Sequence, residues 1–88
     1  MVQVRFTNHL RHVAPPDGVS ASGHTIRDVL ADVFAHHPAI KDYVVDDQGR
    51  VRVHIAVFLD NQHIRRDILD HPVRPDSELY ILQALSGG

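Results

Sequence analysis

A single amphipathic helix stands among segments that alternate between apolar and polar residues, and few folds satisfy this combination. Thr25 and Asp28 form a capping box at the predicted start of the helix,. The helix is expected to end near His37, because Pro38 disfavours helical backbone in the residue before it,. A helix with one apolar face is stable only when that face packs against another element. The apolar residues at helical spacing are Ile26, Val29, Leu30, Val33 and Phe34,.

Most of the remaining chain predicts β-strands. Strict alternation, typical of a strand with one buried face, occurs over residues 2–7, 51–59 and 79–82,. Shorter strands are expected at 19–21 and 62–65, and a further helical turn at 38–43. Turn-forming residues separate these segments at 15–18, 46–49 and 60–61,. Asp60 and Asn61 suit a two-residue hairpin, which places Val57 opposite Ile64 on the core side and Phe58 opposite His63 on the other.

The order of elements predicts one architecture. A hairpin, a helix, a second hairpin and a final strand follow one another, so the helix must cover one face of the sheet. The first and last strands are expected to be parallel neighbours at the sheet centre. The sequence therefore predicts an α+β, β-grasp fold, with a mixed sheet of four to five strands and one main helix on one face. The expected division is a β-grasp domain over 1–85 and a flexible diglycine tail over 86–88.

Composition excludes several classes of function. With 88 residues the chain forms one small domain,. Its formal net charge is -2 with both signs interspersed, so no nucleic-acid partner is expected,. The longest apolar run, residues 55–59, is too short to cross a bilayer, and the first residues lack the order of a signal peptide, so we expect a cytoplasmic protein without a membrane partner,. The absence of cysteine excludes disulfides, cysteine-ligated zinc and thiol catalysis,.

The histidine content is high, with eight in the chain. His9 with His12, and the pair His36-His37, raise the question of a metal site, because neutral imidazole is a common ligand,. A structural zinc ion needs four ligands, and no cysteine or nearby carboxylate set completes either pair,. We expect solvent-exposed histidines and no metal site.

The last two residues, Gly87 and Gly88, follow the final strand by only a few positions. Two glycines place the terminal carboxylate on a narrow segment without a Cβ, which fits a confined active site and reaches φ values closed to other residues. Chance, a truncated linker or an expression scar also produces such an ending. No Ser/Gly-rich linker precedes the pair, which favours a functional tail. The reactive group is then the main-chain carboxylate, because no side chains are arranged as a catalytic set.

These residues resemble the ubiquitin-like sulfur carriers. That family includes the small subunit of molybdopterin synthase, the thiamine-biosynthesis sulfur carrier and the carrier of the thiocarboxylate route to cysteine. The resemblance covers the whole chain. It is most specific over residues 75–88, which contain an acidic turn, the last strand, a short tail and the diglycine. The helix at 25–34 and the strand and turn at 57–61 match the family as well. The family turn often reads Asn-Gly, whereas Gln62 follows Asn61. Molybdopterin synthase subunits commonly carry a Pro-Pro pair where this chain has Gln83-Ala84.

The resemblance implies a defined chemistry. A partner adenylating enzyme related to ubiquitin-activating enzymes would activate the Gly88 carboxylate with ATP, and a sulfur donor enzyme would convert it to a thiocarboxylate. The sulfur would then pass to a downstream sulfur-accepting synthase. Gly88 is the reactive position and Gly87 gives clearance. The chain is expected to be a protein co-substrate, or the non-catalytic small subunit of a sulfur-transfer complex, with no stably bound cofactor and ATP used only by the partner.

The outer face of the predicted sheet carries a candidate docking patch. β-grasp order brings Phe58, Tyr80 and Leu82 close together, and we assign them to partner docking with Ser86 of the tail,. Singly scattered exposed apolar residues are the alternative. Two other functions stay open at this stage: a ubiquitin-like modifier joined to lysines through Gly88, and a β-grasp interaction module without tail chemistry. The sulfur acceptor (molybdopterin, the thiamine thiazole, cysteine, a thiolated nucleotide or a secondary metabolite) and the oligomeric state are also open.

Overall fold

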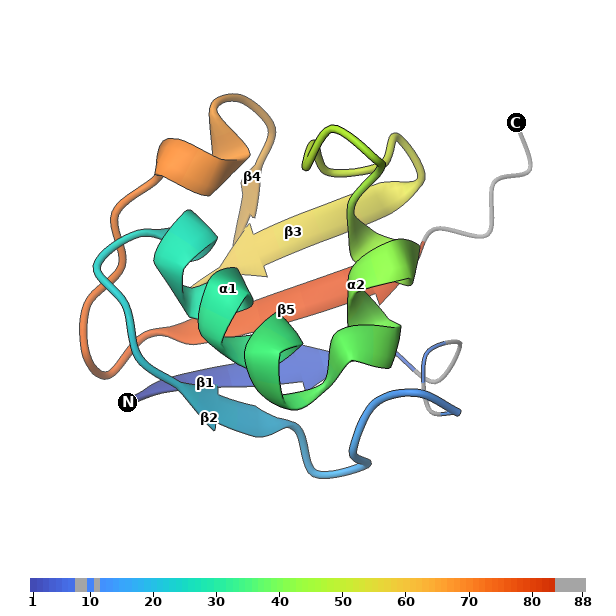
Figure 1. The fold of residues 1–88 in the computed structure, drawn as a ribbon. Helices are drawn as coiled ribbons and strands as arrows, with labels where there is room; N and C mark the ends of the chain where they lie inside the picture. Colours follow the sequence, from blue (N-terminus) through green and yellow to red (C-terminus); the bar gives the residue numbers. More distant parts are fainter. Residues whose placement is uncertain (8–9, 11, 84–88) are drawn as a thin grey trace.

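The computed structural model describes residues 1–7, 10 and 12–83, which form one mixed sheet with two helices on the same face (Figure 1). The five strands lie in the order β2-β1-β5-β3-β4. The strands are β1 (Val2–Phe6), β2 (Val19–Ala21), β3 (Ile55–Leu59), β4 (Gln62–Ile64) and β5 (Glu78–Gln83). The helices are α1 (Ile26–His36), α2 (Pro38–Val44) and the 3-10 helix η2 (Ile68–Asp70).

Strand pairing confirms the β-grasp prediction. β1 and β5 run parallel at the sheet centre, with Val4 opposite Leu79. β2 pairs antiparallel with β1, and β3 pairs antiparallel with both β5 and β4. The register of the second hairpin is also as predicted, with Val57 opposite Ile64. Asp60 and Asn61 between them have φ values of 49° and 71°, which are left-handed conformations that these residue types tolerate,.

Helix α1 begins and ends close to the predicted residues. The Thr25 hydroxyl accepts a hydrogen bond from the Asp28 amide at 3.3 Å, and the Asp28 carboxylate accepts one from the His24 amide at 3.3 Å. The return bond of the capping box therefore reaches one residue further out than the usual pattern. The buried face of α1 joins the strand residues in a single apolar core, and its members are Ile26, Val29, Leu30 and Val33.

The expected strand over residues 51–59 is wrong in its first half, because β3 begins only at Ile55. Val51 instead forms an isolated bridge with Val45, and the Arg52 amide donates to the carbonyl of Val44 at 2.9 Å. This segment therefore pairs with the end of α2, and Val53 is fully exposed. Alternation alone predicts that Val51 and Val53 both face the core, but only Val51 is partly buried,.

One buried polar residue joins the second hairpin to the central strand. Ser77 is 2% exposed, and among the described residues it is the only buried polar or charged one. Its hydroxyl accepts from the Arg74 amide at 2.9 Å and donates to the Asp60 carboxylate at 3.1 Å. The same carboxylate accepts from the Glu78 amide at 2.9 Å. These bonds fix the β3–β4 turn against the start of β5.

We expect Ser77→Ala to lower the free energy of unfolding by about 1–3 kcal/mol, because the Arg74 amide and the Asp60 carboxylate each lose a part-buried hydrogen bond to the Ser77 hydroxyl,. A urea melt measures the loss. Ser20→Ala is the matched control, since Ser20 is exposed and its hydroxyl donates only to the Gln3 side chain. It is expected to change stability by less than about 0.5 kcal/mol. Equal effects of the two substitutions would show that the Ser77 network contributes nothing.

Candidate functional site

The predicted reactive residues, Gly87 and Gly88, lie outside the described residues, as does Ser86 of the predicted docking set. What the structure does describe is the strand that leads to them. β5 is the central strand of the sheet and pairs with β1 on one side and β3 on the other. Its last residue, Gln83, lies opposite Ile55.

Hydrogen bonds hold the end of β5 in place. The Thr7 amide donates to the Ile81 carbonyl at 3.1 Å, which extends the β1–β5 pairing by one residue. The Gln83 amide contacts the Thr7 hydroxyl at 3.4 Å. Ile81 itself is fully buried between Phe6 on β1 and Val57 on β3. The described chain therefore ends on the central strand of the sheet, which is paired on both sides.

Three of the four predicted docking residues come together on the face of the sheet opposite the helices. Phe58 on β3 lies opposite Tyr80 on β5, and Leu82 is two residues further along the same face of β5. Tyr80 is 41% exposed, whereas Phe58 and Leu82 are half-buried. Their neighbours in sequence, Val57 and Ile81, point into the core and are fully buried. The two predicted faces of these strands are therefore correctly assigned.

The structure adds His63 to this surface. Its ring stacks on that of Phe58, with centroids 4.7 Å apart and an interplanar angle of 15°. The predicted hairpin register already placed His63 opposite Phe58, and this register was enough to include His63 in the predicted docking residues. We call Phe58, His63, Tyr80 and Leu82 the outer-sheet patch. Arg5 on β1 lies opposite Tyr80 and is exposed, so a cation borders the patch.

Two further histidines make pairwise contacts. His12 Nε2 lies 3.1 Å from the Tyr43 hydroxyl, and His36 Nδ1 lies 3.0 Å from the Asp32 carbonyl. Within the described part of the chain, no three histidine or carboxylate side chains gather as metal ligands. His9 lies outside that part. Nor does any described helix have the length and apolar character needed to cross a membrane.

One carboxyl group has a clearly shifted pKa, and its role is structural. Hydrogen bonds from the backbone amides of Arg50, at 3.0 Å, and Gln48, at 2.9 Å, lower the pKa of Asp46, and the nearby Arg50 charge adds to this. Asp46 thereby closes the 46–49 turn, in which Gly49 has a φ of 78°.

Known proteins with similar sequences have the same fold as this chain. The model of the ThiS family matches residues 4–88. No curated protein matches the sequence. A chain of the BexX/CysO complex of Amycolatopsis orientalis is 28% identical, with full coverage of both chains and a TM-score of 0.88. CysO of Mycobacterium tuberculosis is 25% identical over 97% of this chain and 100% of its own, with a TM-score of 0.84. Small archaeal modifier protein 1 of Methanosarcina acetivorans is 26% identical over 99% and 95%, with a TM-score of 0.83.

Proposed function

We propose that this chain, which belongs to the ThiS family, is a ubiquitin-like sulfur carrier that acts through its Gly88 carboxylate. The resemblance predicted from the sequence is confirmed at the level of the family. The observation that carries the proposal is that the family match runs from β1 to Gly88 and so includes the diglycine. The β-grasp fold supports it, because the strand that precedes the diglycine is the central strand of the sheet and pairs with a strand on each side.

The chemistry follows from the properties of a carboxylate. Its oxygen is a poor leaving group, so the acyl carbon does not accept a sulfur nucleophile directly. In the proposed first step, a Gly88 carboxylate oxygen attacks the α-phosphorus of ATP and pyrophosphate leaves. A sulfide equivalent from a donor enzyme then attacks the acyl carbon, AMP leaves, and a thiocarboxylate remains. ATP belongs to the partner enzyme, and no side chain of this chain needs to act as acid, base or nucleophile.

The proposal gives each part of the molecule a role. Gly87 and Gly88 provide a segment thin enough to enter the active site of the adenylating enzyme, because neither has a Cβ. The outer-sheet patch provides an apolar docking surface on the face opposite the helices,. The folded domain is the part that an adenylating enzyme, a sulfur donor and a sulfur-accepting synthase bind in turn, and each of them then acts on the same tail.

Reconstitution tests the proposal. The purified chain is incubated with an adenylating enzyme that activates it, with ATP and with sulfide, and its intact mass is followed. We expect an ATP-dependent gain equal to the difference between one sulfur and one oxygen atom, located on the C-terminal peptide. A mass that stays unchanged while the enzyme hydrolyses ATP in the presence of the chain would contradict the thiocarboxylate step.

A protein modifier is the second candidate function. It is supported by the 26% identity to small archaeal modifier protein 1 of Methanosarcina acetivorans over nearly the full length. A modifier would use the same adenylated Gly88, with a lysine amine in place of sulfide as the nucleophile. The two functions therefore share every feature of this chain and differ in the product, which is a thiocarboxylate for the carrier and an isopeptide bond for the modifier.

The proposed docking surface gives a mutational prediction. Phe58→Asp and Leu82→Asp are each expected to weaken binding to the adenylating enzyme by at least about 2 kcal/mol, because an unpaired charge would be buried in an apolar contact. Calorimetric titration measures the affinity. Val53→Asp is the control, since Val53 is a fully exposed apolar residue outside the patch.

Stability measurements complete this test. In denaturant melts, both patch variants should lose much less stability than Ile81→Asp, which places the charge in the core. Normal binding by Phe58→Asp would exclude the patch as the interface. A Phe58→Asp chain that unfolds as readily as Ile81→Asp would show instead that the residue is needed for the fold.

A further inference from the structure

A groove with an apolar floor and a cationic border lies on the helix side of the molecule, away from the outer-sheet patch. It consists of two adjoining hollows that share Arg27 and Leu69 as lining residues. The first has a volume of about 160 Å³, and Leu30, Phe34 and Leu69 contribute to its lining. The second has a volume of about 400 Å³ and extends along η2 to Arg65. We call the two together the α1–η2 groove.

The first hollow has the size of one large apolar side chain. A cavity of about 150 Å³ lined by aliphatic and aromatic groups is enough to hold benzene. Phe34 and Leu69 are only partly buried although they pack on the core, so their remaining apolar surface faces this hollow. Ala31 and Gly49 border it and leave it open, and a Cβ added at Gly49 would meet nothing within 4 Å. An incoming leucine or phenylalanine side chain would thus gain contact with apolar surface.

The net charge of the side chains that line the groove is opposite in sign to the net charge of the whole chain. Four cationic side chains line it, Arg27, Lys41, Arg50 and Arg65, against the two carboxylates Asp67 and Asp70. The lining thus has an excess of two positive charges, whereas the chain has a formal net charge of -2. An acidic ligand is therefore attracted to this part of a protein whose net charge is negative,.

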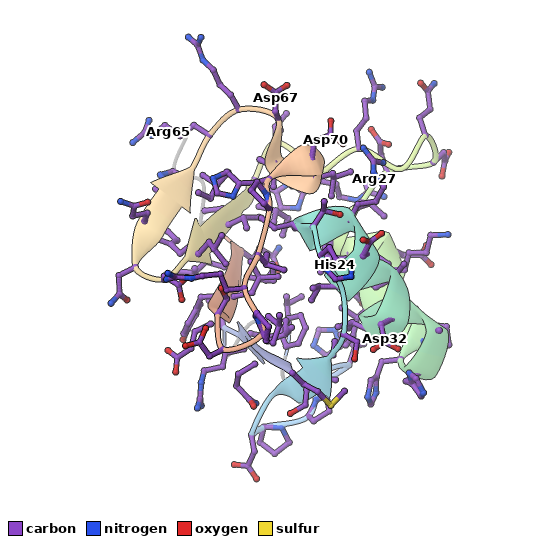
Figure 2. The ribbon with its side chains drawn as sticks, turned by 90° about the vertical axis from the view of Figure 1, so that its left-hand side faces the viewer. His24, Arg27, Asp32, Arg65, Asp67 and Asp70 are labelled. Atoms are coloured by element: carbon purple, nitrogen blue, oxygen red, sulfur yellow. The ribbon has the colours of Figure 1, made fainter. Side chains whose placement is uncertain are left out.

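The ion pairs show where an acidic ligand would bind. Arg27 is paired with Asp70 at 2.9 Å, between α1 and η2, as Figure 2 shows. Arg50 is paired with Asp46, just outside the lining, at 3.4 Å. Lys41 and Arg65 make no ion pair with any other described residue, and they belong to different hollows of the groove. The first hollow therefore combines an apolar lining with Lys41, and the second contains Arg65; neither cation forms an ion pair with another described residue.

We propose that the α1–η2 groove binds a short segment of a partner protein in which acidic residues flank a single leucine or phenylalanine. A phosphate group alone fits less well, because the apolar hollow would stay unfilled. The apolar side chain of such a peptide would fill the first hollow, and its carboxylates would contact Lys41 and Arg65. Because the groove and the outer-sheet patch lie on opposite sides of the sheet, both surfaces can be occupied at once. The inference does not depend on the tail chemistry.

Selection from a displayed library of random peptides tests the groove on the full chain. The Ala31→Trp variant serves for counter-selection, since the exposed Ala31 lines the first hollow and an indole there would fill it. Ala35→Trp is the matched control, an exposed alanine on the same helix outside the lining. We expect enrichment of peptides with acidic residues around one large apolar residue, which bind wild type and Ala35→Trp but not Ala31→Trp. No enrichment, or peptides that bind Ala31→Trp equally, would overturn the proposal.

A synthetic copy of the most enriched peptide then tests the charges. Lys41→Glu combined with Arg65→Glu is expected to weaken its binding about tenfold. Arg66→Glu combined with Arg74→Glu is the matched control, because it reverses the same number of charges at two exposed residues that do not line the groove, and it should change binding by less than about twofold,. Equal losses in the two cases would show that only the net charge matters. Displacement of the peptide by inorganic phosphate at low concentration would assign the site to a phosphate ligand and overturn the proposal.

Discussion

A chain that lacks Gly88 is expected to lose adenylation by its partner enzyme altogether. Removal of one residue shortens the reach of the terminal carboxylate by about 3.5 Å. A misplacement of about 1 Å at a reacting centre already costs about a hundredfold in rate. ATP–pyrophosphate exchange with an adenylating enzyme that activates the wild-type chain measures the loss. The shortened chain should give no exchange above that of the enzyme alone.

Gly87→Val separates the shape of the tail from its length. The chain keeps its terminal carboxylate, but a branched side chain now stands where the proposal requires clearance. We expect exchange to fall at least about a hundredfold. The thermal midpoint should not change in either variant, because the described core is complete by Ile81. Normal exchange by both variants would refute the tail chemistry, and a lowered midpoint would show that the tail is structural.

Leu30→Ala is expected to lower the free energy of unfolding by about 2–5 kcal/mol. Leu30 is 1% exposed and lies midway along the buried face of α1, within the single apolar core. Its truncation removes apolar contacts and leaves a cavity that the helix and sheet cannot fully close. A urea melt gives the difference. The loss is large relative to the total stability of a domain of this size, so the variant should be close to unfolding.

Val53→Ala is the control for this measurement, because Val53 is fully exposed. It should change stability by less than about 0.5 kcal/mol. A loss below about 1 kcal/mol for Leu30→Ala would mean that α1 contributes little to the core. That result would be incompatible with a β-grasp domain in which one main helix covers the sheet.

Much of the fold follows from the sequence because its signals are local. The apolar spacing of residues 26–34 predicts α1, and Pro38 sets its end. The turn at Asp60 and Asn61 fixes the register of β3 on β4, and a period of two then assigns every side chain of those strands to a face,. The segment at 51–54 fails because its partner is the end of α2, which is set by tertiary structure. The 3-10 helix η2, between β4 and β5, has no periodic signal of its own.

Part of the candidate site was likewise predictable from the sequence, and part was not. The outer-sheet patch was predictable, because alternation placed Phe58, Tyr80 and Leu82 on one face and β-grasp order placed their strands side by side. The α1–η2 groove was not, because Arg27, Lys41 and Arg65 come from separate parts of the chain and the sequence pattern of each one is that of a solvated surface charge. The role of Gly88 rests on chemistry and on the family, since the tail lies outside the described residues.

The intact mass of the chain, isolated from cells that express it at its natural level, tests the central claim most directly. The account predicts a fraction of molecules whose C-terminal glycine carries a thiocarboxylate, heavier by the difference between sulfur and oxygen and sensitive to alkylating agents. Loss of the adenylating enzyme should remove this fraction. A carboxylate that stays unmodified under every growth condition would contradict the carrier, and Gly88 found only in isopeptide bonds to lysines would assign the chain to the protein modifiers instead.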